Sequence, residues 1–532
     1  MRIFLRKSRN NLLNTFFIRK IFLEAAWPRE TQWATGLSAT SSLVNKRAEF
    51  IPSGVSGGFP LLSLAEPAHY KLTLIFHFLF FSTAFAQVEG TMPFMKSLPQ
   101  VTYYNPAFKP EYKFSFGLPG SSVFYQYSNN GFSYNDFVAK QKDTLTADLS
   151  KLYGAMKDEN YINNNFQADL FRISLKANAR LYLTFNVTAK SYTRLMLPKE
   201  FVGIFANGTD TYVNSTAALS PKAEALSYAE IGLGAAYTVN KKLTVGANLK
   251  FLRGVTNVST EKATFNLSLS DTYAITAKGD ANIQTSGIHN FNQSDYNAAK
   301  NWRDFMSNTG FAFDLGATYR LIDRLIVGLS LIDIGGISWQ NDLYGYKLDP
   351  NKAVYTFAGI DAKKLLNGDS DYSKSLTDSL EVKFKFTEGR INSYYTALPT
   401  KIYATGVYEL KKNLTVGALL SAESFKGRLM TGFTASLNKE FGRRVGASLS
   451  YTVTNSSFNN LGAGLSLNFA PIQIYFVGDN ILRAPLSLAA NGNVNSFLNS
   501  SQYINFRTGI NFIFGREKTQ EKHPHPKTKK SK

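Results

Sequence analysis

The side chains that most often carry out chemistry in proteins are scarce in this chain. It has no cysteine, and of its five histidines only His289, His523 and His525 follow residue 86. His289 lies in a stretch rich in Ser and Asn, and no group of His, Asp and Glu has the spacing of metal ligands. A Ser-His-Asp triad would require His289 to reach its partners from a loop. The sequence therefore predicts no enzymatic activity, no metal and no cofactor.

Charged residues within largely apolar stretches are better candidates for function. Asp314 and Arg320 are six residues apart on one strand face, about 20 Å at ~3.3 Å per residue, so each requires other partners. By the same parity, Lys250 and Glu409 lie on the polar faces of their strands. These four charges are predicted to face an enclosed space. There they either contribute to function or hydrate and hold a segment inside it.

The elements that must position these charges are β-hairpins, and the clearest one spans residues 231–251. Every second residue from 231 to 239 and from 243 to 251 is apolar, whereas the residues between them are mostly Gly, Ala, Thr or Asn. A period of two residues is typical of β-strands, and residues 240–242 form the predicted turn between two antiparallel strands.

The same alternation would fit a soluble β-sandwich. A sandwich fills its buried face with bulky groups and covers the other with charge, whereas here the second face is small and polar. Apolar groups facing lipid, small or polar groups facing a lumen and aromatic rings near each interface are typical of a transmembrane barrel. Tyr237, three residues before the turn, lies where such a ring is expected, and the chain has 28 Tyr and 42 Phe.

Two further stretches repeat this hairpin. Residues 319–328 and 408–417 share the Tyr-to-Gly spacing of residues 237–246. The last copy fits less well, because Val407 and Leu419 fall on the face that should be polar.

The connections between the predicted strands are unequal in length. Short turns alternate with long segments at 195–224, 259–309 and 335–395, as periplasmic turns and extracellular loops do in barrels. Residues 144–156 carry apolar side chains at helical spacing, which predicts an amphipathic helix that either caps the barrel mouth or is an ordinary loop helix. Residues 262–286 alternate well enough for an extra hairpin above the membrane.

An export signal begins unusually far into the chain. A basic residue, an apolar core and an Ala-Phe-Ala site form a secretory signal peptide at residues 71–86. Its apolar core is too short to span a bilayer as a helix. Residues 1–70 are then either an over-extended reading-frame start or an unusual leader, and the first interpretation is favoured.

Residues 87–110 separate this signal from the first predicted strand. The stretch has four prolines, which prevent a regular strand or helix. It is either a disordered tether or an ordered plug inside the lumen. Within it, Asn105, Pro106 and Ala107 resemble the Asn-Pro-Ala element of the lumenal hatch in fatty-acid-transporter-type outer-membrane barrels.

The resemblance extends over residues 87–515. With the strands at 314–320 and 331–339, this region is similar to the uncharacterised outer-membrane barrels of Bacteroidota-type bacteria (domain of unknown function 5723), which in turn resemble the barrel subunit of the type IX secretion system. The resemblance implies about fourteen strands and an N-terminus inside the lumen.

The strand pattern gives one segment more than this number. Because single-chain bacterial barrels have an even count, either 111–118 or 472–479 is expected to be no strand of its own. The barrel is predicted to occupy residues 111–515 and to be followed by a basic, disordered tail at 516–532. The predicted strands lie near residues 111–118, 121–134, 165–177, 180–194, 225–240, 242–258, 310–320, 324–334, 396–410, 413–424, 428–439, 443–454, 461–470, 472–479 and 503–514.

The charge of the chain raises the question of its partners. A net charge of +21 is typical of nucleic-acid binding, but the basic residues are scattered over turns and loops and form no stripe. We therefore expect no nucleic acid, and instead expect the lipid of the outer membrane around the barrel wall.

Three functions fit such a barrel. In the first, small hydrophobic molecules pass by diffusion and Asn105, Pro106 and Ala107 form a movable hatch. In the second, nothing permeates, and the barrel is a structural or shuttle component of protein secretion or surface display with secreted or surface proteins as partners. The third, an open porin, is disfavoured by the Pro-rich segment and by the weakly charged strand faces.

Overall fold

The computed structural model describes residues 89–141, 144–272, 274–291, 307–357, 378–454, 457–480 and 503–516. The predicted extension at 1–70, the signal peptide at 71–86 and all but the first residue of the tail at 516–532 lie outside the described residues. Among the described residues, no helix is long and apolar enough to cross a membrane.

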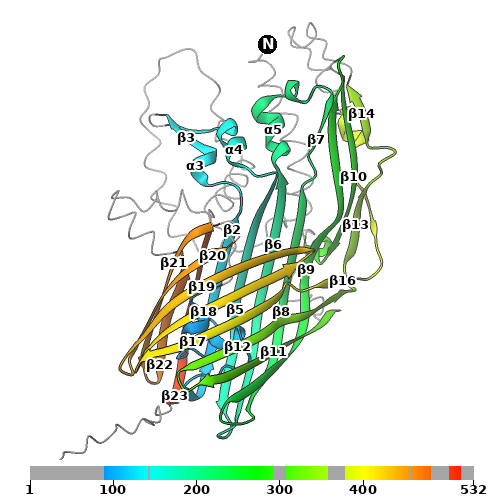
Figure 1. Cartoon of the computed structure of the whole chain (residues 1–532). Helices are drawn as coiled ribbons and strands as arrows, with labels where there is room; N and C mark the ends of the chain where they lie inside the picture. Colours follow the sequence, from blue (N-terminus) through cyan, green and yellow to red (C-terminus); the bar gives the residue numbers. More distant parts are fainter. Residues whose placement is uncertain are drawn as a thin grey trace, which may run out of the picture.

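The described strands form a closed antiparallel β-barrel of fourteen strands (Figure 1). Each strand pairs with the next one around the ring, and the last strand, β23, pairs with the first. The ring consists, in order, of β1 (Tyr112–Gly117) continued by β2 (Val123–Asn129), β5 (Glu159–Lys176), β6 (Leu181–Pro198), β8 (Lys222–Thr238), β9 (Leu243–Leu269), β11 (Asn308–Ile322), β12 (Leu325–Trp339), β17 (Thr400–Lys411), β18 (Leu414–Phe425), β19 (Arg428–Phe441), β20 (Val445–Thr454), β21 (Ser457–Phe469), β22 (Ile472–Asp479) and β23 (Tyr503–Arg516).

The surplus strand of the sequence pattern arises at the start of the barrel. The predicted strands at 111–118 and 121–134 are two halves of one strand, because β1 and β2 both pair with β5 on one side and β23 on the other. The interruption contains Gly120 in the left-handed region, with φ of +89°, which favours glycine. The other suspected segment, 472–479, is a genuine strand, β22.

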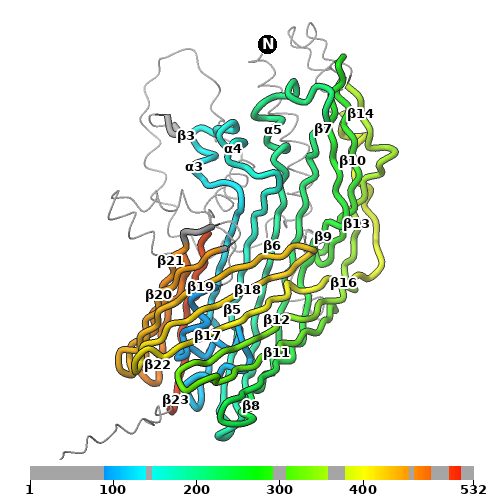
Figure 2. The backbone as a smooth tube through the Cα atoms, in the orientation of Figure 1, coloured from blue at the N-terminus to red at the C-terminus, as the bar shows by residue number. Residues whose placement is uncertain are grey.

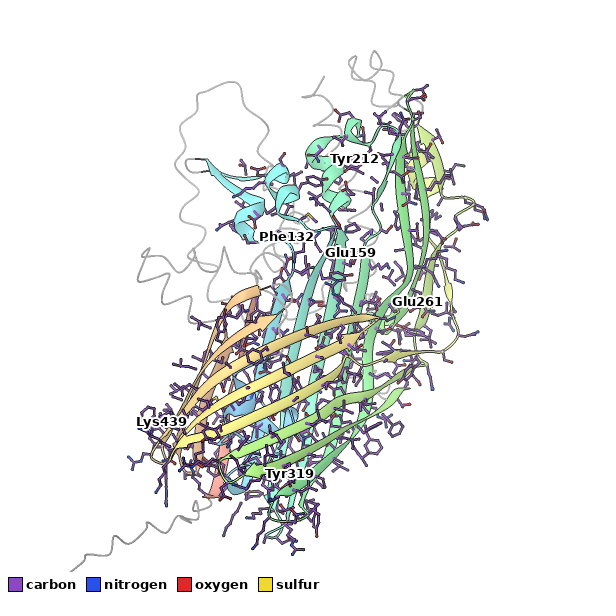
Figure 3. All side chains as sticks on the ribbon, viewed as in Figure 1. Phe132, Glu159, Tyr212, Glu261, Tyr319 and Lys439 are labelled. Atoms are coloured by element: carbon purple, nitrogen blue, oxygen red, sulfur yellow. The ribbon has the colours of Figure 1, made fainter. Side chains whose placement is uncertain are left out.

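The outer surface of the barrel is apolar, as the hairpin pattern predicts. Leu233, Leu249, Phe311 and Leu329 are between 50% and 66% exposed on neighbouring strands, while the residues between them point inward. Near the short turns, Tyr237, Tyr319 and Tyr408 are also exposed, and Figure 3 labels Tyr319 at this end. An apolar belt bordered by aromatic rings identifies the wall as membrane-facing.

The third hairpin copy departs from the pattern for a packing reason. Leu419, on the face predicted to be polar, is 1% exposed, and it packs with Val407 in a buried cluster that includes Met92, Phe94 and Leu98. These lumen-facing apolar groups therefore accommodate the segment that precedes β1.

The long connections form strands and short helices above the barrel (Figure 1). β9 extends upward and pairs with β10 (Ile275–Ser286), which confirms the hairpin predicted at 262–286. The helix predicted at 144–156 is present in part as α4 (Leu149–Ala155). The remaining elements are α3 (Tyr134–Phe137), β3 (Val138–Gln141), β4 (Thr144–Ala147), α5 (Lys199–Asn207), β7 (Ser215–Ala218), α6 (Ile288–Phe291), β13 (Leu343–Leu348), β14 (Val354–Phe357), β15 (Thr387–Arg390) and β16 (Tyr394–Ala397).

Replacing Leu249 by Arg tests which face of the wall meets lipid. Leu249 is 62% exposed within the apolar run of β9, so the new charge would lie in hydrocarbon and should lower the free energy of unfolding by about 2–4 kcal/mol. Val382, 74% exposed before β15, is the control, and Val382→Arg should change it by less than about 0.5 kcal/mol. Denaturant unfolding in liposomes measures both, and equal effects would contradict a lipid-facing belt.

Candidate functional site

Residues 89–108 lie inside the ring of strands, in the half that contains the short turns (Figure 2). Nearly all of them are buried, and their regular structure consists of two short 3-10 turns, η3 (Met92–Phe94) and η4 (Pro99–Tyr103). The predicted absence of a regular strand or helix in this Pro-rich segment agrees with these short turns. That the segment acts as a plug stays a prediction.

The Asn105-Pro106-Ala107 element rests on bare backbone. The Asn105 amide donates to the carbonyl oxygens of Ala317 and Leu329 at 3.2 and 3.3 Å. A Cβ at Gly316 would overlap the Asn105 side chain and Pro106, and a Cβ at Gly246 would overlap the Pro106 carbonyl. Glycine is thus required where the element approaches the wall closely.

The same part of the wall is hollow on its outer side. A depression of about 520 Å³ is lined by small residues, among them Gly246 and Gly316, and by larger side chains such as Tyr237, Leu315 and Leu331. At Gly246 and Gly316 the wall between this hollow and the Asn-Pro-Ala element is backbone alone.

The upper end of the segment is held by charge. The Arg507 guanidinium donates to both carboxylate oxygens of Glu89 at 2.8 and 2.9 Å, and Arg507 is 2% exposed. The backbone N–H groups of Gly90 and Thr91 donate to the Asp479 carboxylate at 2.9 and 3.1 Å. Bidentate Arg–carboxylate pairs are among the stronger charge-assisted hydrogen bonds, so this end is firmly positioned.

The middle of the segment is held by amide and hydroxyl groups. Gln100 and Asn511 exchange two amide hydrogen bonds of 2.8 and 3.1 Å. The Tyr103 hydroxyl donates to the Asp169 carboxylate at 2.5 Å, and the Arg172 guanidinium donates to the Pro99 carbonyl at 3.1 Å. These bonds reach β5 and β23, the two strands that flank the first strand, whereas Asn105 contacts β11 and β12. The segment is therefore connected to the wall in more than one direction.

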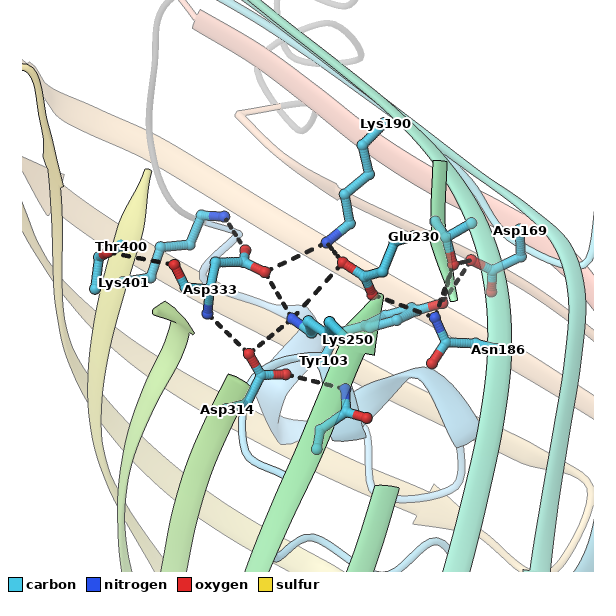
Figure 4. A network of polar contacts seen from close by, with 12 residues as sticks. Tyr103, Asp169, Asn186, Lys190, Glu230, Lys250, Asp314, Asp333, Thr400 and Lys401 are labelled. Atoms are coloured by element: carbon cyan, nitrogen blue, oxygen red, sulfur yellow. Dashed lines mark hydrogen bonds and ion pairs between the residues drawn. The ribbon is translucent and has the colours of Figure 1, made fainter. Parts of the chain in front are cut away.

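A cluster of six charged side chains lies above the segment (Figure 4). Lys250 Nζ is 2.7 Å from Asp314 and 2.6 Å from Asp333. Lys190 Nζ is 2.6 Å from Glu230 and 3.6 Å from Asp333, and Lys401 Nζ is 3.1 Å from Asp333. Three lysines thus neutralise three carboxylates, as buried charges require.

A β-bulge brings the two aspartates together. Phe313 pairs with Ile334 and Leu315 with Leu331, so Asp314 alone faces two residues, Ile332 and Asp333, of β12. Asp333 has φ of +60° and donates its backbone N–H to the Asp314 carboxylate at 2.8 Å. Bulges re-aim side chains, and this one turns both carboxylates toward Lys250.

The four predicted lumen charges divide into two pairs. Lys250 and Asp314, 3% and 1% exposed, meet in the buried cluster. Arg320 and Glu409 are exposed near the short turns, where Arg320 donates to the Asp323 carbonyl at 3.1 Å, and neither takes part in the cluster.

Sequence reasoning missed the remaining members of the cluster. Glu230 lies an even number of residues before Gly232 and Gly234, which are on the inward face of the strand. The alternation therefore already predicted that Glu230 faces the lumen. Asp333 carried no such signal, because the bulge places both Ile332 and Asp333 on the inside, each 3% exposed.

A cavity of about 100 Å³ lies between the segment and the upper barrel. Its walls include Lys190, Lys250, Lys401 and Asp333 of the cluster. Three charged residues outside the cluster also line it, namely Glu89, Arg507 and Glu423. The aromatic rings in its walls are those of Tyr104, Phe124, Tyr192, Tyr228 and Tyr403.

A cluster of buried apolar side chains lies above this cavity. Leu226, Leu252, Ile337, Trp339 and Phe425 belong to it, and each is at most 4% exposed. We refer to these residues and their neighbours Tyr192, Tyr228, Ala312 and Leu398 as the mouth cluster. Trp339 donates its indole N–H to the Thr396 hydroxyl at 3.1 Å, so its polar atom is satisfied.

The tip of the β18–β19 hairpin reaches across to β6, β8 and β9. The Phe425 ring packs edge-on against Tyr192, with ring centres 5.0 Å apart. Lys426 Nζ is 2.8 Å from the Ser259 hydroxyl, 3.2 Å from Glu261 and 3.7 Å from Glu224. The tip is therefore held over the mouth by one apolar and one ionic contact.

The histidine considered for catalysis lies outside these sites. His289 stacks on Tyr344 with ring centres 4.0 Å apart and is 3.4 Å from Glu388. In the part of the chain that the structure describes, no group of three or more His, Cys, Asp or Glu side chains is placed to hold a metal ion.

A family model described as "Family of unknown function (DUF5723)" matches residues 106–479. A comparison with curated proteins found no match.

Solved structures with a similar arrangement are distant. They include a Pseudomonas aeruginosa FadL homologue (TM-score 0.39, 10% identity, 81% of this chain and 100% of that chain), the Ralstonia pickettii toluene transporter TbuX (0.36, 9%, 81% and 95%) and the P. putida toluene transporter TodX (0.36, 8%, 82% and 96%). Similarity at this level carries no argument about what passes through the barrel.

Replacing Lys250 by Met tests whether the cluster is one charge-balanced unit. Lys250 is the cation in contact with Asp314, so its removal leaves a buried carboxylate unpaired and should lower the free energy of unfolding by about 3–5 kcal/mol. Denaturant unfolding is the measurement.

Two further variants control this experiment. Lys262→Met removes the exposed pair with Asp280, 58% and 24% exposed, and should cost less than about 1 kcal/mol. Adding Asp314→Asn to Lys250→Met should restore part of the lost stability. If the exposed and buried variants cost the same, the cluster is not a buried ionic unit.

Proposed function

The chain belongs to the family of unknown function DUF5723, and we propose that it is a gated outer-membrane channel for small hydrophobic molecules, with residues 89–108 as its movable closure. The closed barrel with an apolar outer belt supports the membrane location, because lipid satisfies no open sheet edge.

The observation that carries the proposal is how residues 89–108 are attached. Among the described strand pairings, none joins residues 89–110 to a barrel strand. The segment is held by side-chain contacts such as Glu89–Arg507 and Gln100–Asn511. It can therefore shift without breaking a single hydrogen bond between strands of the wall.

The apolar mouth supports a hydrophobic substrate. The inner wall there carries Leu226, Leu252 and Ile337, each buried on an inward face, and aromatic rings continue below it around the cavity. An apolar molecule would exchange water for these side chains at a favourable ~25 cal/mol per Å² of buried surface.

A second candidate function is a non-transporting structural or shuttle role in secretion or surface display. What favours it is the sheet that rises beyond the membrane and encloses its own small core around Phe265, Leu348 and Phe384. A barrel that only presents such a surface to secreted or surface proteins needs no movable closure.

A disulfide that fixes the segment distinguishes these functions. The Ser97 and Ser466 hydroxyls are 3.2 Å apart across the boundary between the segment and β21, and the chain has no native cysteine. We expect oxidised Ser97→Cys/Ser466→Cys to lose at least about tenfold of its uptake of an apolar fluorescent probe, and reduction to restore it.

The control crosslinks the wall to itself. The Ser191 and Ser227 hydroxyls on β6 and β8 are 2.9 Å apart, so Ser191→Cys/Ser227→Cys adds a disulfide without touching the segment and should leave uptake unchanged. Uptake is measured in cells whose outer membrane otherwise excludes the probe. If the segment crosslink leaves uptake intact, the segment is no gate, and if no variant takes up the probe, the structural role is favoured.

The contacts of the hairpin tip predict a pH dependence. Glu224 lies on the mouth side of the apolar belt, outside the membrane-spanning part, and burial raises its pKa from the usual carboxyl range to about 7, against the opposing effect of Lys426. The closed mouth therefore favours protonated Glu224, and this contribution is complete below about pH 4.5 and lost as the pH rises through about 7.

Uptake of the apolar probe should accordingly increase between about pH 6 and about pH 8. Glu224→Gln removes the titrating group and should hold uptake near its low-pH level throughout. A wild-type uptake that is flat over this range would show that the Glu224 contact does not control the mouth.

A further inference from the structure

The cavity above the segment contains one charge that the cluster does not neutralise. Glu423 on β18 lines the cavity and is 6% exposed. One of its carboxylate oxygens is fully buried without a hydrogen-bond partner. Among the described residues, Glu423 forms no ion pair, whereas an ionised carboxylate removed from water normally requires a partner.

The cations around the cavity are engaged elsewhere. Lys401 faces Glu423 across the β17–β18 ladder, but its Nζ lies 3.1 Å from Asp333. Lys190 and Lys250 contact Glu230, Asp314 and Asp333, and Arg507 pairs with Glu89. Among the described residues, Glu423 is therefore the carboxylate lining the cavity that no cation pairs with.

Arg194 is a further buried cation beside a ring that lines the cavity, and its hydrogen bonds go to other partners than Glu423. It lies over the Tyr192 ring, with its guanidinium carbon 5.4 Å from the ring centre. Its N–H groups donate to the Asn163 side chain at 2.8 Å and to the Phe425 carbonyl at 3.2 Å. The contacts of Arg194 thus position the hairpin tip and do not include Glu423.

We propose that this cavity binds a small organic ammonium ion, with Glu423 as its counter-ion and the surrounding aromatic rings as its walls. A positive group would balance the unpaired carboxylate. Aromatic faces attract cations through their quadrupoles, and Tyr403 is the lining ring available for this, because Arg194 lies over Tyr192 and Lys190 over Tyr228. A carboxylate ligand would instead be repelled by Glu423, and a neutral ligand would leave the charge unpaired.

The size of the cavity limits the ligand. A cavity of about 150 Å³ accepts benzene, and this one has about 100 Å³, so the ammonium ion carries only a few carbon atoms or is the end group of a longer apolar chain. The inference rests on the proposed function only for the route by which the ligand enters. It narrows the substrate class to apolar molecules with an amino group.

Three probes of equal length test the charge requirement. The purified barrel in detergent is titrated with propylammonium, 1-propanol and propionate, and binding is followed by ligand-observed NMR. We expect saturable binding of propylammonium only. Because a hydrogen bond to a charged group is at stake, Glu423→Gln should weaken propylammonium binding by about tenfold or more while preserving the side-chain shape.

Two additional variants keep the test specific. Glu423→Asp keeps the charge but withdraws it from the cavity, and its affinity should lie between those of the wild type and Glu423→Gln. Glu409→Gln removes an exposed carboxylate near the short turns and should bind as the wild type does. Heat-dependent gel mobility verifies that each barrel is folded.

The outcomes separate this inference from the channel proposal. Equal binding of 1-propanol and propylammonium, or an affinity that Glu423→Gln leaves unchanged, overturns the ammonium site. Absence of binding by all three probes shows that the cavity holds water only, and overturns it as well. None of these results alters the expected effect of the Ser97–Ser466 crosslink on probe uptake, which tests the gate alone.

Discussion

The structure depends on the requirement that every backbone N–H and C=O group in contact with lipid be bonded within the protein. The wall meets it by closure, since β23 pairs with both halves of the first strand. The interruption between β1 and β2 is tolerated because the Asp169 and Ser122 backbones remain bonded across it, with the N–H of Asp169 donating to the Ser122 carbonyl at 2.9 Å. Closure also fixes which side chains face lipid and which are enclosed.

Enclosure determines how the lumen is filled. Polar groups in a lumen cut off from bulk water normally require partners, and the structure provides partners for most of them in two ways. Close to the short turns, glycines at positions 246 and 316 let the Asn-Pro-Ala element lie on the backbone itself. Higher up, acidic and basic side chains from facing strands neutralise one another around Lys250 and Asp333. The combination of a close-packed lower half and an ionic middle makes the segment a firmly held but non-covalent occupant.

The cluster of six buried charged side chains contributes little to the stability of the barrel and lies where a function can be expected. Buried ion pairs add little stability relative to apolar packing, yet removing one partner is strongly destabilising. Retaining six such groups beside a cavity, with a seventh at Glu423 left unpaired, is therefore hard to explain by stability alone. The bulge at Asp314 and the left-handed backbone of Asp333 also indicate a functional role for the cluster, because strained backbone of this kind tends to occur at functional sites.

The sequence by itself determined the wall. Period-two alternation over 231–251, its repeats and the contrast between short and long connections were sufficient for a membrane barrel, because each of these features is local in the chain. The same parity placed Lys250 and Asp314 inside and contained the signal for Glu230.

The tertiary structure alone decided that residues 111–118 and 121–134 form one strand, since this depends on shared neighbours. It also decided that Asp333 faces inward, because a bulge reverses the parity on which the sequence argument relied, and that Arg507 meets Glu89, since these residues are 418 positions apart. Contacts between strands on different sides of a ring leave no periodic trace in the chain, so the composition of the enclosed site could only be found in the folded molecule.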